Sequence, residues 1–162
     1  MKGRHHLATH TLIFFAALFL IIVSGKATTL FPFLFGLYLG ETLFVIGFGI
    51  ALYFLGAILP DADSSDRGSR VFYTWFFPLA WIVRLLEYPL SLALKREVKH
   101  RGSLHTVAGI LVSSLVVVLV TSSLYYWLIS DTFFVAVPLF WFFCLFIGQC
   151  LHLLEDRHFQ LV

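Results

Sequence analysis

Four long apolar segments constrain this chain more than any other feature. They cover about residues 7–23, 37–59, 107–128 and 133–153, and each is close to the roughly 20 residues that a helix needs to cross a bilayer. Only 12% of the 162 residues are charged, whereas soluble domains carry about 25%. We therefore predict an all-α integral membrane bundle of about four transmembrane helices, formed by a single domain over residues 1–162.

A further segment at residues 71–94 is apolar and aromatic, but we do not expect it to span. Pro78 and Pro89 interrupt it. Arg84 and Glu87 would lie near the bilayer centre, at a cost of a few kcal/mol per charge. We predict an interfacial or re-entrant helical segment here.

The distribution of basic residues predicts the orientation. With four spans, the loops at about 24–36 and 129–132 share one side of the membrane, and the rest of the polar chain shares the other. Lys26 is the only one of the 11 Lys and Arg residues on the first side. The positive-inside rule then makes the other side cytoplasmic. We expect a multi-pass protein of the inner (plasma) membrane.

Histidine and aspartate residues gather at the four cytoplasmic helix ends. The candidate metal ligands are His6 and His10 in the first helix, Asp61 and Asp63 after the second, His100 and His105 before the third, and His152 and Asp156 at the end of the fourth. Imidazole and carboxylate groups are common zinc ligands. Because four helix ends meet at one membrane face, these groups can cluster without a long-range loop.

Two of these motifs lie where a helix ends or begins. In "LPDADS", Pro60 stops the second helix, and an extended Asp61-x-Asp63 would aim both carboxylates to the same side. In "HRGSLHT", Ser103 is predicted to cap the third helix, which would place His105 in its first turn. Alone, "LPDADS" is a weak signal, because solvated Asp-rich turns are common, and the alternative for "HRGSLHT" is a pair of interfacial histidines that bind headgroups.

The two other motifs lie within predicted helices. In "HLLED", His152 and Asp156 are four residues apart and share a helix face. In "HHLATH", His6 and His10 have the same spacing, and either one could supply the ligand from the first helix.

In order and combination, these motifs resemble the membrane-bound metal-dependent hydrolase family that includes the LexA-binding inner-membrane hydrolases. The shared pattern is an early His-Leu, then Leu-Pro-Asp-x-Asp, His-Arg-Gly-x-x-His-Ser/Thr and a late His-Leu-x-x-Asp. The resemblance implies metal-ligand roles for Asp61, Asp63, His100, His105, His152 and Asp156, with His6 as the ligand from the first helix and His10 as second choice. By analogy, it also implies similarity to helical zinc phosphodiesterases.

The sequence thus predicts a membrane-embedded metal-dependent hydrolase that acts at the cytoplasmic interface on phosphate esters of lipids. Zn²⁺ is the expected metal, in two or more ions because the ligands exceed one tetrahedral set, with Mn²⁺ or Mg²⁺ as alternatives. Asp61 or Asp63 would accept the proton of the attacking water. Arg101 would stabilise charge on the phosphoryl group. Membrane lipid is the expected partner, and nucleic acid is not, because there is no ordered basic face.

Three other functions use the same residues. A membrane peptidase or amidase would need the metals but not Arg101. A metal transporter would need polar residues in both leaflets, whereas the outer half of the chain offers little beyond Glu41. A non-catalytic metal-binding protein would fill every coordination position with its own side chains.

Overall fold

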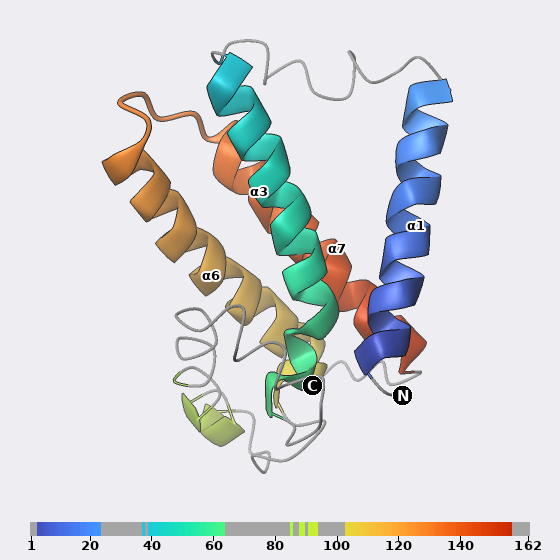
Figure 1. The fold of residues 1–162 in the computed structure, drawn as a ribbon. Coiled ribbons are helices and arrows are strands. Elements are labelled where there is room, and N and C mark those ends of the chain that lie inside the picture. The colour runs from blue at the N-terminus through green and yellow to red at the C-terminus, as the bar shows by residue number, and fades with distance from the viewer. Residues whose placement is uncertain are drawn as a thin grey trace.

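The computed structural model describes residues 3–23, 37, 39–63, 85, 88–89, 91–93 and 103–156. Four long helices dominate these ranges, which contain no β-strand (Figure 1). They are α1 (Gly3–Val23), α3 (Leu39–Ile58), α6 (Val107–Leu128) and α7 (Ala136–Glu155). The predicted all-α membrane bundle is confirmed. The prediction of a single domain over the whole chain stays a prediction.

Helices α3, α6 and α7 are each long and apolar enough to cross a membrane. Helix α1 has 21 residues and contains a shorter apolar stretch, Ala8–Leu20. The helix ends differ from the predicted ones by a few residues, as at α1, which begins at Gly3. Within residues 71–94 the structure describes only Leu85, 88–89 and 91–93, all helical. The prediction of an interfacial segment therefore lies largely outside the described residues.

Successive helices run in alternate directions. The start of α1, the end of α3, the start of α6 and the end of α7 consequently lie at the same end of the bundle (Figure 1). Helix α7 contacts each of the other three, and its pairing with α3 is the most extensive.

Two glycines let α3 and α7 approach closely. A Cβ atom added to Gly148 would meet the carbonyl oxygen of Tyr53, and one added to Gly56 would meet the carbonyl oxygen of Leu145. Small residues at such crossings permit direct backbone contact between membrane helices. The crossing lies near the end of α3 and therefore helps to position the residues that follow it.

Aromatic packing joins the helices toward the other end of the bundle. Trp141 of α7 is fully buried, and its Nε1 donates to the carbonyl oxygen of Val45 on α3 across 2.9 Å. Its ring centroid lies 4.7 Å from that of Phe48 and 5.3 Å from that of Tyr125 on α6. This cluster anchors α3, α6 and α7 at a distance from the polar helix ends.

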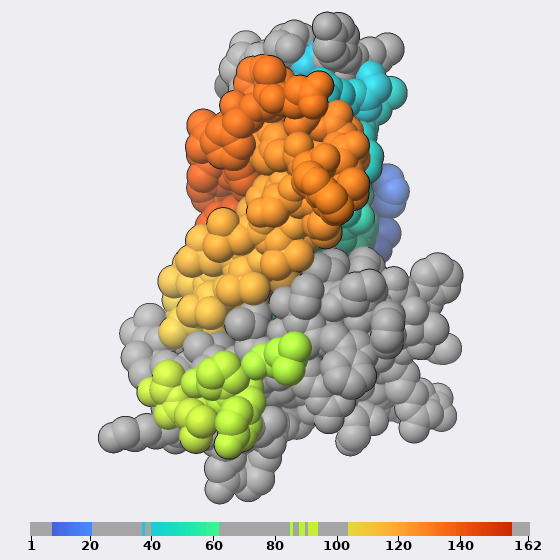
Figure 2. Space-filling view, turned by 90° about the vertical axis from the view of Figure 1, so that its left-hand side faces the viewer, coloured from blue at the N-terminus to red at the C-terminus, as the bar shows by residue number. Residues whose placement is uncertain are grey.

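The outer surface of α6 suits a lipid environment. Helix α6 crosses the face shown in Figure 2, and its exposed residues include Leu111, Leu115 and Leu119 at a spacing of four. Its buried face instead mixes hydroxyl residues, Ser113 and Ser114 among them, with aliphatic ones. The helix thus presents leucines to the membrane and a mixed face to its neighbours.

Candidate metal centre

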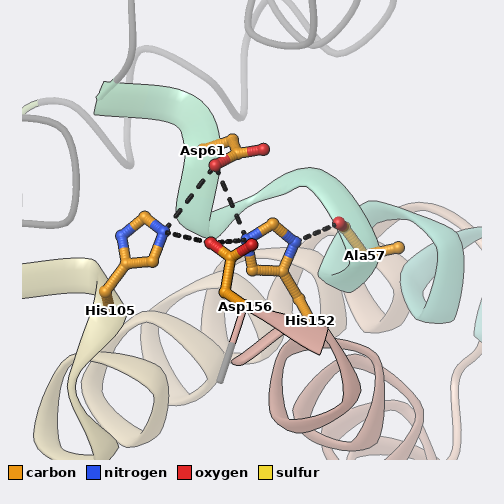
Figure 3. Close-up of polar contacts among 5 residues, drawn as sticks. All are labelled: Ala57, Asp61, His105, His152 and Asp156. Atoms are coloured by element: carbon orange, nitrogen blue, oxygen red, sulfur yellow. Dashed lines mark hydrogen bonds and ion pairs between the residues drawn. The ribbon is translucent and has the colours of Figure 1, made fainter. Parts of the chain in front are cut away.

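Four side chains converge at the polar end of the bundle (Figure 3). Asp61 comes from η2 (Pro60–Asp63), the 3-10 turn after α3, and His105 from η3 (Ser103–His105), just before α6. His152 and Asp156 come from the end of α7. Each residue offers one ligand atom, and these four atoms all lie within 4.8 Å of one another. The four side chains are at most 10% exposed.

The chain around Asp61 differs from the sequence prediction. Pro60 does end α3, but residues Pro60–Asp63 form a 3-10 turn instead of an extended stretch. Residues two apart in a 3-10 turn do not share a face. The expectation of an extended Asp61-x-Asp63 stretch is therefore wrong, although Asp61 does lie in the cluster.

The helix cap near His105 is also displaced from its predicted position. Ser103 begins a 3-10 turn, and the N-cap of α6 is Thr106, whose Oγ accepts a hydrogen bond from the backbone N–H of Gly109 at 2.9 Å. The extended backbone of Thr106 ends the turn and starts the α-helix. His105 consequently precedes the helix, next to the cap.

The distances within the cluster are longer than direct hydrogen bonds and approach the separations between ligands of one ion. Asp61 Oδ1 lies 3.7 Å from His105 Nε2 and 3.5 Å from His152 Nε2. Asp156 Oδ2 lies 3.9 Å from each of the same nitrogens. Hydrogen bonds of this kind measure about 2.7–3.2 Å. A tetrahedral zinc with bonds of about 2.0–2.2 Å separates its ligand atoms by about 3.3–3.6 Å.

The orientation of His152 is held by a backbone group. Its Nδ1 lies 2.8 Å from the carbonyl oxygen of Ala57 on α3. A carbonyl only accepts, so Nδ1 carries the proton, and in the neutral ring Nε2 presents its lone pair to the carboxylates. Metal-binding histidines usually donate their second N–H in this way, which fixes the tautomer and the ring orientation.

Electrostatics also prepare the site for a cation. Burial raises the pKa of the Asp61 carboxyl, but polar interactions with His105 and His152 outweigh it, so that pKa lies well below its ordinary value. Burial lowers the pKa of His105 by more than the neighbouring carboxylates raise it. At neutral pH the site therefore offers an ionised Asp61 and an uncharged His105, the forms that bind metal.

The remaining predicted ligands lie elsewhere or outside the described residues. His10 is fully buried but is not part of the cluster, and its ring packs against Tyr53 with the centroids 5.6 Å apart. The Tyr53 hydroxyl donates to the His10 carbonyl oxygen at 3.2 Å. His10 is thus placed by the packing of α1 on α3. The side chains of His6 and Asp63, and both His100 and Arg101, lie outside the described residues.

Sequence reasoning did not find the Ala57 carbonyl. Its contribution comes from the backbone, so no residue type could reveal it. Its position one helical turn before Asp61 is the only sequence signal. The sequence predicts two or more ions, but the described side chains form only one group of candidate ligands. This group is Asp61, His105, His152 and Asp156.

Comparison with known families gives one match. The family model described as YdjM inner membrane protein matches residues 33–159, most of the chain and all four residues of the cluster. The chain belongs to the YdjM inner membrane protein family. Comparisons with curated proteins and with solved structures found no match.

The YdjM match corrects the resemblance suggested by the motifs. Its description names an inner membrane protein and no hydrolytic activity, so assignment to a metal-dependent hydrolase family is wrong as a statement of family. Together with the three apolar helices, the match establishes a membrane protein of an inner-membrane family.

Proposed function

We propose that this YdjM family member is a membrane-embedded metal-dependent hydrolase with its site at the cytoplasmic interface. The observation that carries the proposal is the convergence of two imidazole nitrogens and two carboxylate oxygens, with His152 turned toward the carboxylates by the Ala57 carbonyl. A mixed imidazole and carboxylate set favours a divalent ion, with Zn²⁺ first and Mn²⁺ as the alternative.

The four residues have different roles in this proposal. Catalytic zinc sites usually have three protein ligands and one position for water. We assign His105, His152 and Asp61 to the metal, because Asp61 Oδ1 lies nearer both imidazoles than Asp156 Oδ2 does. The lowered pKa of Asp61 keeps it anionic, which suits a ligand and not a base. Asp156 is then left to accept a proton from the reacting water.

A bound divalent ion would activate water and neutralise charge on an ester oxygen. The proposed substrates are phosphate esters of lipids. Two features support lipid substrates. The cluster lies at the ends of membrane helices, and a run of basic residues precedes His105 in the sequence: Lys95, Arg96, Lys99 and Arg101. Each such charge near a membrane surface attracts anionic headgroups by about 1 kcal/mol. Arg101 is the proposed phosphoryl contact.

Metal content and hydrolysis, measured on the same purified samples, test this assignment. The samples are wild type, Asp61→Asn, Asp156→Asn and, as a matched control, Asp131→Asn in the exposed loop between α6 and α7. We expect about one divalent ion per chain in the wild type and in Asp131→Asn, and little in Asp61→Asn. Asp156→Asn should retain the metal but lose hydrolysis of lipid phosphate esters in mixed micelles. Equal metal content in all four proteins would contradict the proposal.

A second candidate function is metal binding without catalysis. It is favoured by the number of ligand-type residues, because four protein ligands can close a tetrahedral site. In that case Asp156→Asn should lose the metal as Asp61→Asn does, and the wild type should hydrolyse no ester. Hydrolysis of amides by a protein with Arg101→Ala would instead indicate the peptidase alternative.

A further inference from the structure

Gln149 of α7 is buried at the interface with α6, and both ends of its amide are hydrogen-bonded. Ser113 Oγ donates to Gln149 Oε1 across 2.9 Å, and Gln149 Nε2 donates to Ser114 Oγ across 2.8 Å. All three residues are at most 1% exposed. In apolar surroundings few substitute partners exist for such groups, so the pairing strongly favours one alignment of the two helices.

The Gln149 network, defined as Gln149, Ser113 and Ser114, joins α7, which carries His152, to α6, which follows His105. Gln149 precedes His152 by one helical turn on α7, whereas Ser113 and Ser114 lie on α6, the helix that follows His105 directly. A slide of one residue along a helix displaces a side chain by about 1.5 Å. Metal–ligand distances are held to about 0.2 Å, so even a fraction of that slide would disturb binding.

Other hydroxyl groups on α6 behave differently. Thr121 Oγ donates to the Val117 carbonyl oxygen at 2.8 Å, and Ser122 Oγ donates to that of Val118, both within the same helix. These bonds do not restrain α6 against α7. Thr121 therefore offers a matched control for the loss of a buried hydroxyl.

We propose that Gln149 is a positioning residue that sets the register of α7 against α6 through Ser113 and Ser114, and thereby the separation of His105 from His152. The inference rests on the proposed metal site. It predicts that the network affects metal affinity and coordination geometry although none of its residues contacts the metal.

The test compares Gln149→Met with the wild type and with Thr121→Val. Methionine keeps the length of the side chain and removes its hydrogen bonds, and Ser113 can still donate to the Ile110 carbonyl oxygen, 3.1 Å away. We expect Gln149→Met to bind Zn²⁺ about 10-fold more weakly. This is the smaller of the losses in metal affinity that follow when a residue supporting the metal ligands is replaced. The visible spectrum of its Co²⁺ form should also shift. Thr121→Val should match the wild type in both measurements.

A second variant tests the inference even if the Gln149→Met protein does not fold. The double substitution Ser113→Ala with Ser114→Ala should weaken Zn²⁺ binding similarly, and adding Gln149→Met to it should weaken binding no further, because the three residues act as one unit. Additive losses would overturn the inference. So would unchanged affinity and spectrum in Gln149→Met, which would leave the metal site intact. A wild type without Zn²⁺ binding would overturn the site and the inference together.

Discussion

His152 Nδ1 donates to the carbonyl oxygen of Ala57 across 2.8 Å and so joins the last turn of α7 to the last turn of α3. The final four carbonyls of an α-helix lack intrahelical donors, and Ala57 provides one of these in α3 (Leu39–Ile58). The bond therefore supplies a donor to a buried helix end. It also turns Nε2 of the imidazole toward Asp61 Oδ1, 3.5 Å away. Helix termination and site geometry depend on the same contact.

Metal should stabilise the folded protein. Because Asp61, His105 and His152 come from three separate elements, an ion bound between them holds those elements together only in the folded state. A ligand at 100 times its Kd stabilises by about 2.7 kcal/mol, so Zn²⁺ should raise the Tm by several degrees and a chelator should reverse the rise. Differential scanning fluorimetry in detergent measures this. The response should vanish in His152→Ala, and a persistent response there would place the ion elsewhere.

Zn²⁺ affinity should weaken as the pH falls through the range in which histidines titrate, ordinarily about 6.5. Protons compete for the imidazole nitrogens, and because burial lowers the pKa of His105, its competition begins below that value. Asp61, whose pKa is also lowered, stays ionised throughout this range. Competition titrations between pH 5 and 8 should show an affinity that falls at lower pH, with a slope that approaches about two protons per ion. An affinity that does not change with pH over this range would contradict this ligand set.

Gly148→Ala should destabilise the protein and weaken metal binding together. The added Cβ meets the Tyr53 carbonyl oxygen, so α7 must move away from α3 and strain the bond between His152 and Ala57. Overpacking of this kind costs about 1–3 kcal/mol. Chemical unfolding and Zn²⁺ titration measure the two effects. Gly47→Ala on α3 is the control, because its Cβ would meet nothing within 4 Å, and it should leave metal binding unchanged.

Trp141→Phe should lower stability without changing metal affinity. The substitution removes the hydrogen bond from Trp141 Nε1 to Val45, worth about 1 kcal/mol. At a rise of about 1.5 Å per residue, Val45 lies about 24 Å from Asp61 along the axis of α3. The metal ligands should therefore not move. Unfolding in denaturant measures the stability, and Zn²⁺ titration measures the metal affinity. A loss of affinity in this variant would mean that the site depends on packing throughout the bundle.

Much of the architecture could be predicted from hydrophobic length. An uninterrupted apolar run near 20 residues favours a membrane helix whatever its neighbours are, and Val107–Leu128 agrees with its predicted range. The polar residues at the helix ends could likewise be assigned to one end of the bundle, because the direction of each helix alternates. Asp61, His105, His152 and Asp156 were among the candidates for this reason.

The membership of the cluster required the tertiary structure. His10 is also a fully buried histidine, yet the packing of α1 on Tyr53 keeps it out of the group. The Ala57 carbonyl and the Gln149 network depend on the rotation and register of one helix against another. Periodicity along the sequence determines which segments form membrane helices, since that depends on local hydrophobicity. Only packing between helices decides which polar atoms meet within a few ångströms, because small rotations and slides change those distances without changing the pattern of the sequence.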